Sequence, residues 1–71
     1  TMNDEKLTAL KSLAKSFIDW DLVKANYPDF NSFLPAFGRI NSLFNLDMLT
    51  AHYLLVIIKE FYEDPEVVKS W

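Results

Sequence analysis

The chain has 71 residues, of which 51% are hydrophobic and 15% aromatic, and its 7 Lys and Arg against 10 Asp and Glu give a net charge of −3. This length supports one domain, residues 1–71, and the high apolar content argues against intrinsic disorder. The absence of Cys excludes disulfide scaffolds, thiolate zinc sites and cysteine nucleophiles, and the negative charge argues against a strong polyanion binder.

The N-terminal residues suggest where the natural chain begins. Thr1 precedes Met2, and we interpret Thr1 as a remnant of cloning, so we expect the natural start at Met2. The charged residues that follow are unlike a signal peptide. The longest apolar run, residues 48–58, is shorter than the roughly 20 residues that span a bilayer. We therefore expect a cytoplasmic protein with no membrane span.

Helical spacing of apolar residues predicts a first helix over residues 4–19. If this helix continued, Asp21 would enter the apolar face, where a buried carboxylate is costly. We therefore expect Asp19 to cap a separate short helix over residues 20–26, which stops before Pro28. The apolar face of the first helix consists of Leu7, Leu10, Leu13, Ala14, Phe17 and Ile18.

A second long amphipathic helix is predicted over residues 32–44. With Asn31 or Ser32 as its cap, Pro35 falls in the first turn, where its missing N–H has no helical partner to lose. Asn41 lies near the edge of the apolar face, and burial of Asn41 without a hydrogen-bond partner would indicate a wrong register. The apolar face includes Phe30, Phe33, Leu34, Phe37, Ile40, Leu43 and Phe44.

The third long helix, predicted over residues 47–62, is apolar around most of its circumference. Its polar stripe is narrow and consists of His52, Lys59 and Glu63. Such a helix is typical of a central, buried element. The sequence Asp64-Pro65-Glu66 then predicts the start of a short helix over residues 65–70. The fold class is all-α: a small bundle of three main helices and two short ones around a Phe-rich core.

The chain offers few groups for chemistry. His52 is the only His, and the positions one helical turn away from it hold only apolar side chains. No Gly-rich turn could form an oxyanion hole. The helix that a helix-turn-helix would use for recognition carries a single basic residue, Lys59. We therefore expect no enzyme, no cofactor, no metal site and no nucleic acid partner.

The surplus of apolar residues favours binding to protein, because a 71-residue bundle cannot cover all of them. We expect a small regulator, inhibitor, immunity or antitoxin-type factor that self-associates as a homodimer, with residues 53–71 holding much of its working surface. Acidic residues would steer a basic partner. The expected interface is Tyr53, Leu54, Ile58, Phe61, Tyr62 and Trp71, and the expected steering residues are Glu60, Glu63, Asp64 and Glu66.

Three alternatives stay open at this stage. The chain could be a tightly packed monomer with Phe61 and Tyr62 in its core. It could bind a small apolar ligand between its helices, or, less favoured, a nucleic acid. In size, acidity and helical character it resembles many small bacterial and phage accessory proteins in a general way, and no motif names one family.

Overall fold

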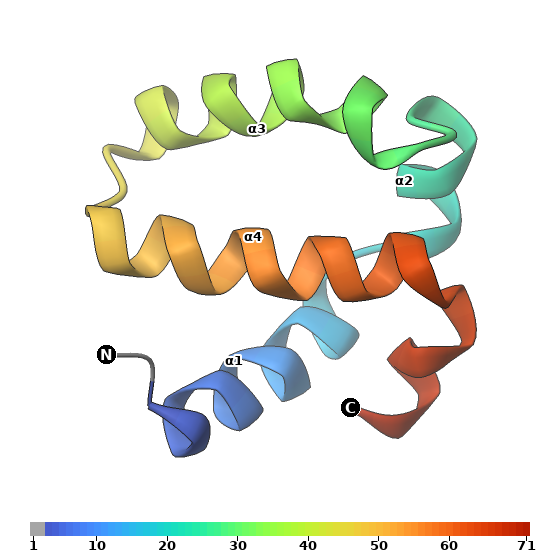
Figure 1. Cartoon of the computed structure of the whole chain (residues 1–71), viewed down its shortest axis with the longest axis horizontal. Coiled ribbons are helices and arrows are strands. Elements are labelled where there is room, and N and C mark those ends of the chain that lie inside the picture. Colours follow the sequence, from blue (N-terminus) through green and yellow to red (C-terminus); the bar gives the residue numbers. More distant parts are fainter. Residues whose placement is uncertain (1–2) are drawn as a thin grey trace.

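A computed structural model of the chain describes residues 3–71, and these residues form five helices and no strand (Figure 1). This confirms the all-α fold class. The expected natural start at Met2 lies outside the described residues. In chain order the helices are α1 (Asp4–Phe17), α2 (Trp20–Asn26), α3 (Phe30–Phe44), α4 (Met48–Glu63) and η1 (Pro65–Ser70).

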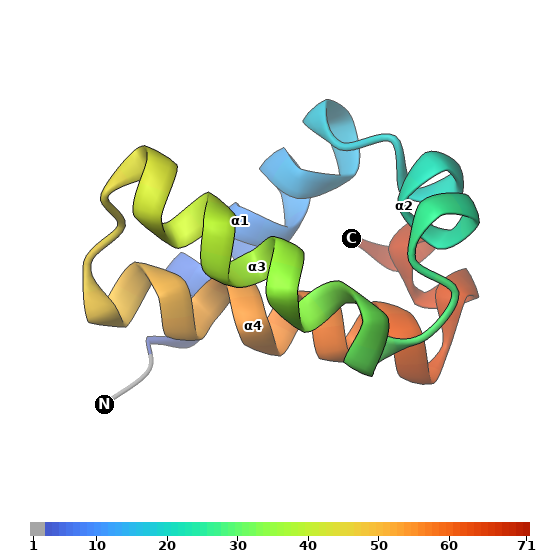
Figure 2. The same ribbon diagram turned by 90° about the horizontal axis from the view of Figure 1, so that it is seen from above.

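The helix α4 is the central element, as its nearly all-apolar circumference predicts. It lies between α1 and α3 and contacts both, and η1 folds back against it from its C-terminal end (Figures 1 and 2). The short α2 sits at the end of the bundle where α4 runs into η1 (Figure 1). Within residues 3–71, no helix combines the length and the apolar character needed to cross a membrane.

The first helix is two residues shorter than predicted. It begins after Asn3, whose side chain accepts a hydrogen bond from the Lys6 N–H, and it ends at Phe17 because Ile18 is extended, with φ −106° and ψ 130°. The extended backbone continues into Asp19, whose carboxylate accepts a hydrogen bond from the Leu22 N–H at 3.1 Å. Asp19 is therefore the predicted cap of α2.

The start of α3 corrects a prediction. Asp29 and Ser32 form a capping box, in which the Ser32 N–H donates to the Asp29 carboxylate at 2.8 Å and the Asp29 N–H donates to the Ser32 hydroxyl at 3.2 Å. The helix therefore begins at Phe30 rather than at residue 32. Pro35 then lies inside the helix, beyond the first turn, so that one helical hydrogen bond, to the Asn31 carbonyl, cannot form.

At the remaining helix ends Asp64 is the predicted cap of η1, whereas α4 begins one residue later than predicted, at Met48, because Asp47 is its cap. Asn45, in the left-handed region with φ 50°, ends α3. The Asp47 carboxylate caps α4 and accepts hydrogen bonds from Thr50, which lowers its pKa from the ordinary 3.8. The Asp64 carboxylate accepts a hydrogen bond from the Glu66 N–H. The segment it caps is a 3₁₀ helix, a conformation that suits a run of only six residues with a proline at its start.

The core is built where α4 meets its neighbours. Ile57 on α4 is fully buried. Asn41 is half-buried at the edge of α3, and its amide donates to the Phe37 carbonyl at 2.8 Å, while its carbonyl oxygen is buried without a partner. The predicted register of α3 therefore holds, with one polar atom unsatisfied. The buried residues are Ala14, Trp20, Phe33, Ala36, Tyr53, Ile57, Ile58 and Phe61.

We expect Ile57→Ala to lower the free energy of unfolding by about 2–5 kcal/mol, because it leaves a cavity at a fully buried position. The control is Lys59→Ala, at an exposed position of the same helix outside any apolar patch, which should change that free energy by less than about 0.5 kcal/mol. Urea unfolding followed by circular dichroism measures both. Equal losses in the two variants would contradict the assigned core.

We expect Pro35→Ala to stabilise the protein by about 1–2 kcal/mol, because it restores a helical hydrogen bond while giving up part of the rigidity that proline confers on the unfolded chain. Thermal unfolding of the variant and of the parent chain measures the difference. A lower melting temperature for Pro35→Ala would mean that the proline ring has a packing role that outweighs the missing bond.

Candidate interaction surface

The structure corrects the predicted interface. Tyr53, Ile58 and Phe61 lie in the core of the chain itself, with 5%, 7% and 3% of their surface exposed. The other three residues of that set, Leu54, Tyr62 and Trp71, are half-buried. Residues 53–71 therefore do not carry most of the surplus apolar surface.

Trp20 of α2 packs against two of these residues, Phe61 and Trp71. The Trp20 ring lies 4.6 Å from the Phe61 ring and 5.4 Å from the Trp71 ring, measured between centroids. Its indole N–H donates to the Ala14 carbonyl at 3.1 Å. The Lys15 ammonium donates to the Lys69 carbonyl at 3.1 Å. The segment 65–71 therefore docks on its own chain.

Tyr62 joins the end of α4 to the turn before α3. Its hydroxyl donates to the Tyr27 carbonyl at 2.6 Å, and the Lys24 ammonium lies 5.3 Å from the centre of its ring. Burial, together with the nearby Asp29 carboxylate, raises the pKa of the Tyr62 hydroxyl above its ordinary 10.0. Tyr62 is thus a structural contact, with its polar end already bonded.

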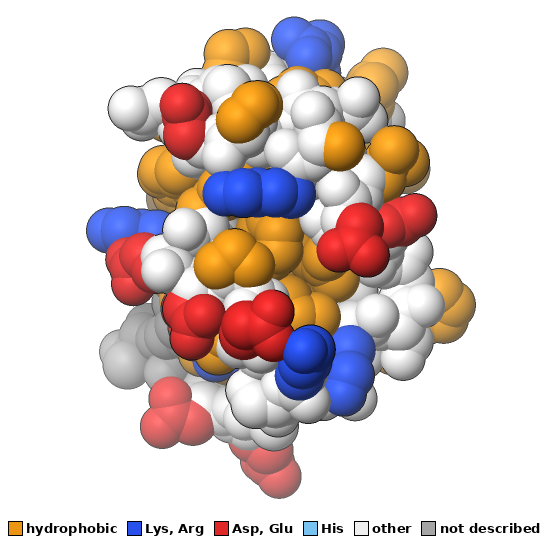
Figure 3. Space-filling model, turned by 90° about the vertical axis from the view of Figure 1, so that its right-hand side faces the viewer, with side chains coloured by type: hydrophobic (Ala, Val, Ile, Leu, Met, Phe, Trp, Pro, Cys, Tyr) orange, Lys and Arg blue, Asp and Glu red, His pale blue; other side chains and the backbone are white. Residues whose placement is uncertain are grey.

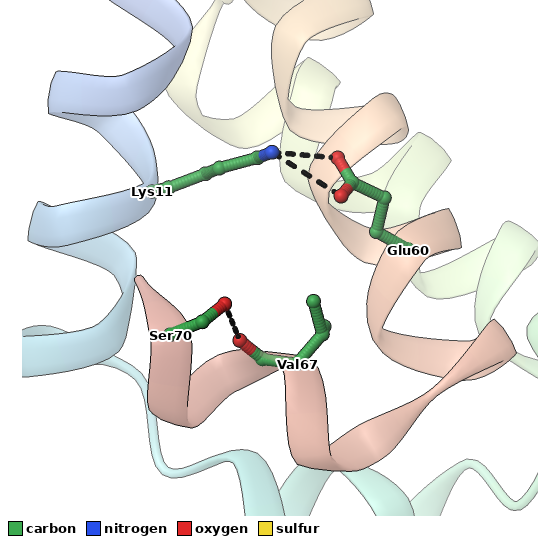
Figure 4. Close-up of polar contacts among 4 residues, drawn as sticks. All are labelled: Lys11, Glu60, Val67 and Ser70. Carbon is green, nitrogen blue, oxygen red and sulfur yellow. Dashed lines mark hydrogen bonds and ion pairs between the residues drawn. The ribbon is translucent and has the colours of Figure 1, made fainter.

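Half of the predicted steering acids are paired with lysines. The Glu60 carboxylate lies 2.9 Å from the Lys11 ammonium, in a contact between α1 and α4 (Figure 4). The Glu66 carboxylate pairs with Lys69 at 2.6 Å. Asp64 caps η1, and Glu63 is exposed. Figure 3 shows acidic and basic side chains interspersed on one side of the molecule, so that this side presents no block of a single charge.

The exposed large hydrophobic side chains, apart from Leu34, belong to two other parts of the chain. The first, the α1–α2 patch, spans the end of α1 and the start of α2, where Phe17 is 83% exposed. The second, the α3–α4 corner, surrounds the turn between those helices, where Met48 is 90% exposed. The α1–α2 patch consists of Leu13, Phe17, Ile18 and Leu22, and the α3–α4 corner consists of Leu43, Phe44, Met48 and Leu49.

Sequence reasoning placed five of these residues on helix faces that the core would absorb, although one signal pointed to the exposure of some of them. The five are Leu13, Phe17, Ile18, Leu43 and Phe44. The apolar arc of the first helix covers roughly 140° on a helical wheel, with Leu13 at one edge and Ile18 at the other. In a small bundle a helix contacts only a few neighbours, so that the edges of a wide arc are left uncovered, and both edges are exposed here. The structure also exposes Phe17, which lies no farther from the centre of the arc than buried Ala14, so the wheel does not predict the exposure of Phe17.

An apolar pocket of about 310 Å³ opens beside the α1–α2 patch, with Ile18 common to both. It lies between the end of α1, α2, α3 and α4. Three of its lining residues, Trp20, Phe33 and Ile58, are core residues, so the pocket reaches into the core. Its full lining is Ile18, Trp20, Val23, Tyr27, Phe33, Phe37, Ile40, Leu54 and Ile58.

Other chemistry-bearing residues stand apart. His52 is exposed on α4, as its place in the polar stripe predicts. Across residues 3–71, no three His, Cys, Asp or Glu side chains come together in a group that could hold a metal ion. Comparison with protein-family models, curated proteins and solved structures finds no match to this chain.

We expect Tyr62→Phe to lower the free energy of unfolding at pH 7 by about 1 kcal/mol, because the hydrogen bond to the Tyr27 carbonyl is lost. In the parent chain the raised pKa favours the protonated hydroxyl in the folded state, so its contribution is complete below pH 10 and falls as the pH rises through that value.

The measurement is urea unfolding between pH 7 and pH 11. The difference between the parent chain and Tyr62→Phe should shrink above pH 10. A difference that is constant across this range would show that the hydroxyl does not titrate differently in the folded and unfolded states.

Proposed function

We propose that this chain acts by binding protein and that it associates with a second copy of itself through the α1–α2 patch and the α3–α4 corner. One observation carries the proposal: these two patches place eight large hydrophobic side chains in solvent on a chain whose whole accessible surface is 5005 Å². Exposed apolar patches of that kind are typical of interaction sites.

The exposed area is adequate for a stable contact. A large apolar side chain presents roughly 150–200 Å² when fully exposed, so each patch offers on the order of 400 Å². A contact that buried both patches would approach the roughly 800 Å² per partner that a standard protein interface buries. Phe17, Phe44 and Met48 are also of residue types that are enriched at interfaces.

The charges around the α1–α2 patch suit self-association. Lys15 and Lys24 flank the patch together with Asp19 and Asp21, so two copies related by a twofold axis can meet without net repulsion. A twofold contact uses the same surface on both copies. Because this patch has both positive and negative charges at its rim, lysines of one copy can face aspartates of the other. The burial would also stabilise a domain whose own core is small.

The cellular role stays a prediction. A small protein that presents apolar anchors fits a regulator, inhibitor, immunity or antitoxin-type factor. The paired state of Glu60 and Glu66 supports a smaller electrostatic contribution than the sequence suggested, because paired charges attract a basic partner less. Glu63, which is exposed, would still attract a basic partner.

Light scattering coupled to gel filtration tests the proposal. The parent chain should show a mass of two chains, and the double variant Leu13→Ser, Phe17→Ser should associate at least about tenfold more weakly, a loss of about 1.4 kcal/mol. The matched control is Leu34→Ser, which removes an exposed leucine outside both patches and should leave the mass unchanged. A mass of one chain at the highest soluble concentration would contradict self-association.

A further inference from the structure

We propose that the apolar pocket between α1, α2, α3 and α4 is a binding site for a small, uncharged hydrocarbon group, because it has about twice the volume of an apolar cavity that binds benzene. This inference is independent of self-association. It rests on the composition of the pocket, its size, and the way in which the surrounding aromatic rings hold it open.

The lining excludes charged and polar ligands. Every lining residue has an aliphatic or aromatic side chain. The indole N–H of Trp20 is already used by the Ala14 carbonyl, and the backbone carbonyl of Tyr27 already accepts the Tyr62 hydroxyl. A charged or strongly polar group placed among these residues would lose its hydration without gaining a partner. Water is disfavoured for the same reason.

The size of the pocket suits an organic molecule. An apolar cavity of about 150 Å³ is large enough to bind benzene. The present pocket, at about 310 Å³, has about twice that volume and lies at the lower end of the range of known ligand sites. A two-ring aromatic hydrocarbon or a medium-length alkyl chain therefore fits its dimensions.

Aromatic rings brace the pocket against collapse. The Phe33 ring meets the Tyr27 ring edge to face at 5.3 Å and lies 6.4 Å from the Phe37 ring, measured between centroids. Trp20, which also lines the pocket, is held against Phe61. Because these flat, rigid side chains are fixed by one another, neighbouring residues cannot readily relax into the space. The pocket is thus a partly open apolar hollow that reaches the core residues Trp20, Phe33 and Ile58.

The experiment uses naphthalene as the probe and the full chain labelled at Ile, Leu and Val methyl groups. Naphthalene added up to its solubility limit should shift the methyl signals that line the pocket in a saturable way. The methyl groups of Leu34 are the internal control, since Leu34 is exposed outside both patches and outside the pocket lining. The reporting methyl groups are those of Val23, Ile40, Leu54 and Ile58, which leaves out Ile18 because it also belongs to the α1–α2 patch.

A filling variant tests the position of the site. Leu54→Phe places a larger side chain in the pocket and should weaken naphthalene binding at least about tenfold, since even one methylene changes affinity in an apolar pocket by about that factor. Leu55→Phe, at the neighbouring half-buried position outside the lining, should bind like the parent chain. If Leu54→Phe loses the signal dispersion of a folded protein, Ile40→Phe replaces it with the same expectation.

Three results would overturn the proposal. The first is the absence of any shift at the solubility limit. The second is a shift at Leu34 as large as that in the pocket, which would indicate general attraction to exposed apolar surface. The third is a shift of the Val23, Ile40, Leu54 and Ile58 signals with protein concentration alone, which would place a second copy in the pocket. Because self-association is read separately from the mass in light scattering, failure of either proposal is distinguishable from failure of the other.

Discussion

The indole of Trp20 joins parts of the chain that are far apart in sequence. Its N–H donates a hydrogen bond to the carbonyl of Ala14 near the end of α1. Its ring packs on Phe61 of α4 and on Trp71 after η1. A break between α1 and α2 makes this possible, because a continuous helix would direct Trp20 and Asp21 differently and would put the carboxylate in the core. The extended backbone at Ile18 and the Asp19 cap therefore control how the C-terminal end docks.

The same contact decides where the surplus apolar surface goes. The α4 helix is covered by α1 on one side, by α3 on another and by η1 at its end, and α2 supplies a further cover through Trp20. Those neighbouring helices pack their inner faces against α4, so little of their surface is available to cover one another. The edges of α1 and the turn between α3 and α4 consequently stay in solvent, with Phe17 and Met48 as their most exposed large side chains.

The apolar pocket follows from the same geometry. A small domain has few side chains with which to fill the space where four helices converge, and here several of those side chains are rigid aromatic rings. Two kinds of apolar surface therefore coexist: open patches, which suit a protein partner, and a hollow bounded by core residues, which suits a small molecule. Ile18 lies at the border between them, so a ligand in the pocket would sit next to the proposed dimer contact.

Local features of the chain were predictable from sequence. The helices, the break before α2 and the caps at Asp19 and Asp64 depend on residues within one or two turns of each other, so their signals are contained in short windows of sequence. The central place of α4 was predictable too, because a helix that is apolar nearly all round must be buried. The capping box of Asp29 with Ser32 is also a local feature. The predicted start of α3 was wrong because Asn31 or Ser32 was taken as its cap in place of Asp29.

The assignment of side chains to core or surface needed the tertiary structure. Phe17 and Phe61 are both aromatic residues on the apolar side of a helix, yet one is 83% exposed and the other 3%. No local pattern distinguishes them, since the difference lies in which helices pack against each residue. The sequence by itself determined which elements form and that apolar side chains exceed what the bundle can cover. Only the packing of α2, α3 and η1 around α4 decided which of those side chains stay exposed and where the pocket opens.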